Sequence, residues 1–86
     1  MFNGIIFKTG IIKTIKKYKN SKLVGLKSNI KFKKTDIGSS VSCNGVCLTL
    51  AKINKNLIYF YVSSETIKRS NFKNIRIGQI INIEKS

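Results

Sequence analysis

The chain has 86 residues, of which 42% are apolar, so it is long enough for one domain with a thin core and too apolar for a disordered tail. Lys and Arg number 17 against 3 Asp and Glu, which gives a formal net charge of +14. The absence of His excludes a Ser-His or Cys-His catalytic pair within one chain and removes the commonest metal ligand.

The N-terminal part of the sequence predicts β-structure. Residues 4–8 form an apolar stretch typical of a strand, Gly10 interrupts it, and residues 11–18 continue it as a second strand or as the far side of a bend. Ile12 and Ile15 are three positions apart, which breaks strict alternation and indicates a β-bulge.

Residues 22–27 are the next strand candidate. Val24 and Leu26 share one face, and Gly25 on the opposite face weakens the strand signal. Residues 28–39 are polar and irregular, and we expect three apolar side chains to anchor them to the core: Ile30, Phe32 and Ile37.

The middle of the chain predicts a hairpin. Residues 40–43 and 46–53 flank Asn44-Gly45, the strongest turn signal in the sequence. Two sets of side chains alternate along the second strand: Val46, Leu48 and Leu50 on one face, and Cys47, Thr49 and Ala51 on the other. After a further turn, residues 57–62 form a buried aromatic strand.

The last third of the chain predicts one short helix and a final strand. Ser63 or Ser64 caps the helix, and Glu65 lies in its first turn, where the helix dipole favours a negative charge. We expect the helix to end near Asn71 and the last strand to cover residues 80–84. About six short strands predict an all-β fold, a small closed barrel, and an oligonucleotide-binding barrel is the alternative on architecture alone.

The positive charge has two interpretations. Lys (15), Ile (15) and Asn (9) are all encoded by codons rich in A and T, so a genome rich in these bases raises all three together. The lysines are also dispersed along the chain, which favours solvated side chains. The alternative is a surface that binds nucleic acid or another polyanion through its phosphate groups.

The start of the chain predicts a cytoplasmic protein, and this location predicts the state of the two cysteines. Cys43 and Cys47 are expected to be reduced there, although a tight turn between them would allow a disulfide. Two Cys without His fall short of the four ligands of a structural zinc site, so we expect no metal. The N-terminus lacks the regions of a signal peptide, and no apolar run reaches the roughly 20 residues of a membrane span.

Residues 38–49 carry the most specific pattern in the chain. Their sequence, G-S-S-V-S-C-N-G-V-C-L-T, resembles the G-x-S-V-x-x-N-G-V-C-L-T segment of riboflavin synthase and related lumazine-binding proteins. Three other blocks resemble the same family in the same order: residues 1–6 (M-F-x-G-I-[IV]), 65–71 (E-T-L-x-R-T-N) and 77–84 (L-G-D-x-V-N-x-E). Only residues 17–37 match weakly.

The resemblance implies a six-stranded antiparallel Greek-key barrel with one short helix between strands five and six. This single lumazine-binding barrel spans residues 1–86 and corresponds to the first half of a two-barrel enzyme. Riboflavin synthase, a transferase without metal or redox cofactor, moves a four-carbon unit between two molecules of 6,7-dimethyl-8-ribityllumazine. The products are riboflavin and a ribityl-diaminopyrimidine.

The same resemblance implies a second barrel as partner, because the family's site lies between the first barrel of one subunit and the second barrel of another. That partner is either another copy of this chain in a homodimer or the C-terminal barrel of a trimeric full-length enzyme. No membrane partner is expected, and nucleic acid is disfavoured.

The resemblance also implies which residues contact the lumazine or flavin. The catalytic set is Ser40, Cys47 and Thr49, in which the two hydroxyls hydrogen-bond the ring or an attacking water and Cys47 lines the pocket. Glu65 and Thr66 hold the pyrimidine edge and the ribityl chain. The remaining binding positions are Gly4, Ile5, Ile6, Leu48, Tyr61, Val62, Ser63 and Ser64.

These assignments have alternatives. In the alternative interpretation, Thr49 and Cys47 are ordinary residues on a strand face. Ser40 then hydrogen-bonds only the backbone at a strand end, and Glu65 only places a negative charge in the first turn of the helix. For the whole chain, one alternative is a lumazine- or flavin-binding module without turnover. Another is a basic barrel for single-stranded nucleic acid, which requires exposed aromatic side chains along a basic groove.

Overall fold

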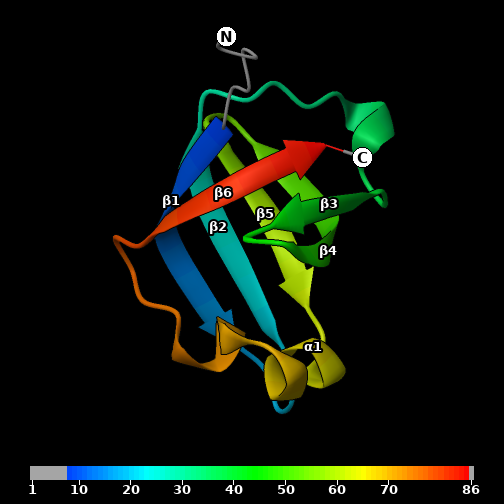
Figure 1. The fold of residues 1–86 in the computed structure, drawn as a ribbon. Coiled ribbons are helices and arrows are strands. Elements are labelled where there is room, and N and C mark those ends of the chain that lie inside the picture. Colours follow the sequence, from blue (N-terminus) through cyan, green and yellow to red (C-terminus); the bar gives the residue numbers. More distant parts are fainter. Residues whose placement is uncertain (1–7, 86) are drawn as a thin grey trace, which may run out of the picture.

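In the computed structural model, which describes residues 8–85, six antiparallel strands close into one barrel (Figure 1). The strands are β1 (Lys8–Lys17), β2 (Lys22–Ser28), β3 (Ser40–Cys43), β4 (Val46–Asn54), β5 (Leu57–Val62) and β6 (Ile80–Lys85). Their order around the barrel is β1-β2-β5-β4-β3-β6. The strands β3, β4 and β5 follow one another, and β6 returns to pair with β3, which is a Greek-key connection. The predicted fold class is therefore confirmed.

β1 is a single bent strand that passes through Gly10 without a break. Its register with β2 shifts between Ile12 and Thr14, which confirms the predicted bulge. The predicted strand at residues 4–8 lies, apart from Lys8, outside the described residues.

The interior of the barrel is filled by alternate side chains of the six strands. Leu48 and Leu50 face inward, as the alternation in β4 predicts, whereas Cys47 and Thr49 face outward. The largest fully buried side chains are Phe60, Ile12, Leu26, Leu50, Ile81 and Ile83. Because these apolar side chains occupy the inside of the barrel, the polar side chains lie on its outer surface and in the loops.

The segment between β2 and β3 packs against the core through two of its three predicted anchors. Ile30 and Phe32 contact the buried cluster, and the Phe32 ring meets the Phe60 ring edge-on with centroids 6.3 Å apart. The prediction for Ile37 is wrong, since 43% of this residue is exposed. Ile37 ends the short 3-10 helix η1 (Lys34–Asp36), and the chain turns at Gly38, where φ is +95°, before the side chain reaches the core.

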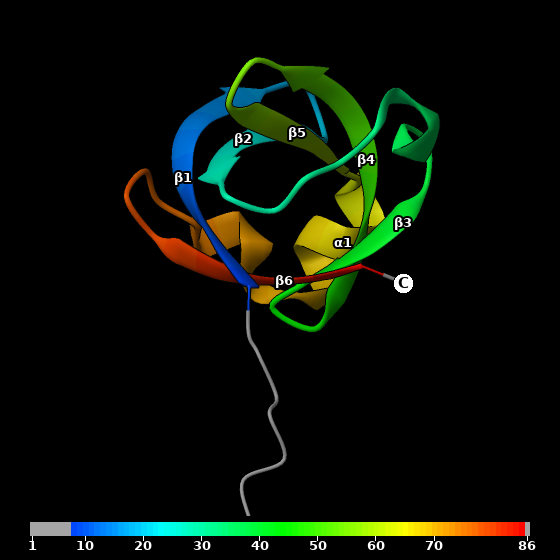
Figure 2. The same cartoon turned by 90° about the horizontal axis from the view of Figure 1, so that it is seen from above.

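Two short helices close one end of the barrel, as the view along its axis shows (Figure 2). They are the α-helix α1 (Ser64–Arg69) and the 3-10 helix η2 (Asn71–Asn74), so the predicted helix ends two residues early. The interruption lies at Ser70, whose hydroxyl donates to the Thr66 carbonyl and accepts from the Phe72 amide. No helix within the described part of the chain is long and apolar enough to span a membrane.

Cross-strand packing over Gly25 compensates for the glycine in the middle of β2. Gly25 lies opposite Thr14 on β1 and opposite Tyr59 on β5, and both side chains fold over it on the outer face. A Cβ at this position would lie 2.9 Å from Tyr59 Cε2 and closer still to Thr14 Oγ1. The missing side chain is therefore replaced by cross-strand packing, which buries the glycine.

We expect Gly25→Ala to lower the free energy of unfolding by about 1–3 kcal/mol, because the added methyl displaces the Tyr59 ring and the Thr14 side chain. Urea denaturation followed by circular dichroism measures the change. Lys27→Ala, an exposed position on the same strand, is the control and should stay within about 0.5 kcal/mol of the wild type. Equal stability of the Gly25→Ala variant and the wild type would contradict this account of the packing.

Candidate functional site

Three of the predicted site residues form one row across the outer face of the barrel. Ser40 on β3 lies opposite Thr49 on β4, and Thr49 lies opposite Tyr61 on β5. Side chains of directly opposite residues in an antiparallel sheet lie on the same face, with Cβ atoms about 5 Å apart. All three residues are exposed, with Tyr61 at 44%. The row places two hydroxyl groups beside an aromatic ring on one open surface.

Cys47 lies next to this row, two residues before Thr49 on the same face of β4. It is exposed and its thiol is free. The two other predicted positions on these strands, Leu48 and Val62, are only 4% and 0% exposed and face the core. Their side chains contribute to packing, so they support the site from inside the barrel.

The start of α1 places the remaining predicted residues beside the strands. Ser63 caps the helix by accepting from the Thr66 amide at 3.2 Å, and the two side-chain hydroxyls lie 3.0 Å apart. Glu65 is exposed and forms an ion pair with Arg69 at 3.3 Å. A hydroxyl pair and a charged pair therefore lie at the beginning of the helix that directly follows β5.

A surface hollow of about 290 Å³ joins α1 to the β3–β4 hairpin. Glu65 and Thr66 line it from the helix, and Gly45 and Val46 line it from the hairpin turn. Arg69 and Ser70 also line this hollow, although neither is among the predicted site residues. The sequence could have indicated both residues, because they belong to the 65–71 block that carries the family resemblance.

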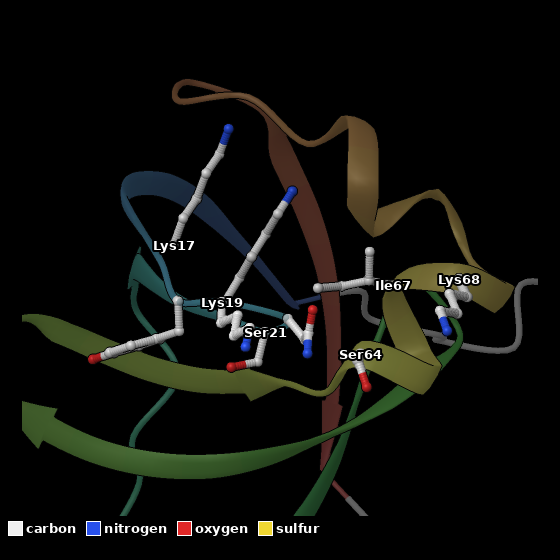
Figure 3. A pocket seen from close by; sticks show the side chains of 9 residues that line it. Lys17, Lys19, Ser21, Ser64, Ile67 and Lys68 are labelled. Carbon is white, nitrogen blue, oxygen red and sulfur yellow. The ribbon is translucent and has the colours of Figure 1, made fainter.

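Ser64 is separated from this group, since it lines a different hollow between α1 and the turn that joins β1 to β2 (Figure 3). Gly4, Ile5 and Ile6 lie outside the described residues. The structure thus sets predicted residues of β3, β4 and β5 in one row and lines a hollow with residues of α1 and the β3–β4 turn, whereas Ser64 lines a different hollow.

The two cysteines differ sharply in environment. Cys43 is fully buried, and this burial raises the pKa of its thiol from 9.0 to about 12, with a smaller contribution from the neighbouring Cys47. Because Cys43 faces the core and Cys47 faces solvent, the two side chains lie on opposite faces of the hairpin. This arrangement favours two free thiols, and it leaves Cys43 without a nucleophilic role.

Residues 8–85 contain no group of three or more His, Cys, Asp or Glu side chains that could together bind a metal ion. The site consists instead of neutral hydroxyls, one aromatic ring, one exposed thiol and one ion pair. Such a set suits a polar, flat organic ligand whose edges carry hydrogen-bonding groups.

Comparison with known proteins gives a consistent result. A sequence-family model described as "Lumazine binding domain" matches residues 3–86. Riboflavin synthases of Buchnera aphidicola subsp. Baizongia pistaciae and Photobacterium leiognathi are 36% and 38% identical to the whole chain, which spans 41% and 40% of their lengths. The chain therefore covers less than half of these relatives.

Solved structures show the same similarity. The protein LumP in complex with flavin mononucleotide is 29% identical to this chain, with a TM-score of 0.77, and 98% of this chain aligns with 48% of that one. Crystal structures of LumP with 6,7-dimethyl-8-(1'-D-ribityl) lumazine and with riboflavin have TM-scores of 0.74 and 0.75.

The buried thiol of Cys43 predicts a loss of stability at high pH. In the unfolded chain this thiol ionises near its ordinary pKa of 9.0, whereas in the fold it keeps its proton up to about 12. Its contribution to stability is therefore complete below pH 9 and is lost as the pH rises toward 12. Urea denaturation at several pH values between 8 and 11 measures the slope.

The Cys43→Ala variant should show a shallower decline over this range than the wild type, while Cys47→Ala should decline as steeply as the wild type. Apart from the substituted cysteine, both variants keep every titratable side chain of the wild type. Parallel pH profiles for the two variants would contradict the assignment to Cys43.

Proposed function

The chain belongs to the lumazine-binding domain family, and from that premise we propose that it binds 6,7-dimethyl-8-ribityllumazine and riboflavin on the outer face of β3, β4 and β5 beside α1. One observation carries the proposal. The blocks at residues 38–49 and 65–71, which both carry the family resemblance, lie far apart in the sequence but line one surface hollow, the first through the hairpin turn at Gly45 and Val46 and the second through α1. The hollow therefore adjoins the hairpin whose two strands carry Ser40 and Thr49.

The side chains on this surface suit a lumazine or flavin ring. Such a ring is flat and carries carbonyl oxygens and nitrogens at its edge, so it needs hydrogen-bonding groups around its rim. Thr49 and Ser40 offer hydroxyls at that rim, and the exposed Tyr61 ring offers an apolar surface beside them. In this proposal Glu65 and Thr66 hold the pyrimidine edge and the ribityl hydroxyls.

We further propose that the barrel contributes one half of a site that converts two lumazines into riboflavin. One lumazine gives up four carbons and leaves as a ribityl-diaminopyrimidine, and the other accepts them, so no outside oxidant is consumed. The outer face of a single barrel covers only one side of a ring. A second barrel facing it supplies the other side and the second substrate, whether from another copy of this chain or from a C-terminal barrel.

The reaction begins with loss of a proton from the C7 methyl group of one lumazine. The resulting anion is spread over the ring, so hydrogen-bond donors at the rim stabilise it more than one strong base would. The chain has no His and its Cys43 thiol is held neutral, which leaves Ser40 and Thr49 as donors or as the groups that orient a water. Cys47 lines the pocket beside them.

A binding module without turnover is the second candidate, and the LumP structures favour it. These structures contain lumazine, riboflavin or flavin mononucleotide, and LumP aligns with 98% of this chain. The two free thiols suit a reducing compartment, and we propose the cytoplasm as the location in either case.

Titration with 6,7-dimethyl-8-ribityllumazine, followed by ligand fluorescence, tests the binding proposal. Thr49→Val keeps the shape of the side chain but removes its hydroxyl, so we expect the Kd to rise about fivefold, equivalent to about 1 kcal/mol for one hydrogen bond. Thr9→Val is the matched control, because Thr9 is exposed on β1, three strands away from β4 in either direction around the barrel.

The same samples separate the two candidates. Slow formation of riboflavin, lost in Thr49→Val, supports a transferase site assembled from two barrels. Binding without riboflavin formation, even after a second barrel is added, supports the binding module. Failure of the wild type to bind lumazine, or equal weakening by Thr49→Val and Thr9→Val, would overturn the proposed site.

A further inference from the structure

The hollow on the other side of α1 is a second feature that the proposed function does not use. It has a volume of about 410 Å³ and lies between the β1–β2 turn and the helix (Figure 3). Four lysines line it, together with an amide, three hydroxyl-bearing residues and one aliphatic residue: Lys17, Lys19, Lys22 and Lys68, then Asn20, Tyr18, Ser21, Ser64 and Ile67.

The hollow carries unbalanced positive charge. None of the chain's three acidic residues lines it, and the nearest in sequence, Glu65, is paired with Arg69 on the other side of α1. Ser64, Ile67 and Lys68 share one face of the helix because they are spaced by three and four residues. The fold thus places Lys68 of α1 on the same concave surface as the three lysines at and beside the β1–β2 turn.

Lys22 differs from the other three lysines because its ammonium group is bound within the fold. The group donates to the carbonyls of Phe72 and Lys73 in η2, both at 3.1 Å, which holds the start of β2 against η2. Burial lowers the pKa of Lys22, and the positive charge of Lys17 lowers it further. An anion in the hollow would offset both effects.

We propose that this hollow binds the phosphate group of a small phosphomonoester. The lysines that line this hollow make its surroundings positive, which favours a doubly charged anion, and Ser21 and Ser64 add hydroxyl donors for its oxygens. Ile67 and the Tyr18 ring provide an apolar wall for the organic part of the ligand. The source of the phosphate is either a free phosphomonoester or the phosphate of a flavin mononucleotide.

The shape of the site favours a small ligand over a nucleic-acid strand. A strand that tracks a protein surface needs a continuous basic groove with exposed aromatic side chains for successive bases. Here the lysines surround a single hollow, and Tyr18, at 49% exposure, is the one aromatic residue among its lining residues.

Inorganic phosphate at low salt and pH 7.5 is the first probe, with amide and lysine chemical shifts of the intact chain recorded by NMR. We expect saturable shifts at Lys19, Ser64 and Lys68, a rise in the Lys22 pKa, and weaker binding as salt screens the charges. The variant Lys19→Gln/Lys68→Gln removes two exposed charges from the hollow and should weaken binding about tenfold.

Lys31→Gln/Lys34→Gln is the matched control, because it removes the same charge from two exposed lysines that do not line the hollow. It should leave the phosphate affinity within about twofold of the wild type. Equal weakening by both double variants, no saturable shift, or tighter and equally salt-sensitive binding of a single-stranded oligonucleotide would overturn the proposal.

A comparison of riboflavin with flavin mononucleotide, which differ only by a phosphate, then identifies the source of the phosphate that the hollow binds. Only this comparison rests on the proposed function. Tighter binding of the mononucleotide, lost in Lys19→Gln/Lys68→Gln, shows that the hollow receives the flavin's own phosphate. Equal flavin affinities together with saturable phosphate binding assign the hollow to a separate phosphomonoester. Failure of riboflavin to bind counts against the proposed function and leaves the phosphate result standing.

Discussion

β1 closes the barrel by pairing with β6 along its first residues and with β2 along the rest of its length. The two sets of pairs overlap at Gly10 and Ile11, so the strand must bend while both ladders stay intact. Gly10 is buried there, and a Cβ would lie 2.9 Å from Ile83 Cδ1. A bare backbone at the overlap lets the ring close, which removes the exposed strand edges that would otherwise pair with other chains.

A closed and filled barrel decides where chemistry can take place. The interior is occupied by Phe60 and its aliphatic neighbours, so the polar residues of the family blocks lie outside, on β3, β4, β5 and α1. A ligand on such a surface remains open to water on one side. This geometry is why the proposed transfer reaction needs a second barrel as a cover, and it agrees with relatives that are more than twice as long as this chain.

The helix α1 divides the surface at its end of the barrel into two regions of different chemistry. Glu65, Thr66 and Arg69 face the hollow shared with the β3–β4 hairpin, where charges are paired. Ser64, Ile67 and Lys68 face the hollow shared with the β1–β2 turn, where positive charge is in excess. The proposed lumazine site and the proposed phosphate site therefore adjoin different faces of the same short helix.

The sequence by itself determined the strands, the bulge in β1, the hairpin at Asn44-Gly45 and the inward and outward faces of β4, because these features follow from local periodicity and turn chemistry. The family blocks also pointed to Thr49, Ser40, Glu65 and Thr66.

Only the tertiary structure decided which of these residues meet. It set Ser40, Thr49 and Tyr61 in one row, turned Ser64 away from them, exposed Ile37, and gathered lysines from the β1–β2 turn and α1 around one hollow. The physical reason is that strand register and barrel closure fix distances between residues remote in sequence, and local patterns carry no information about those distances.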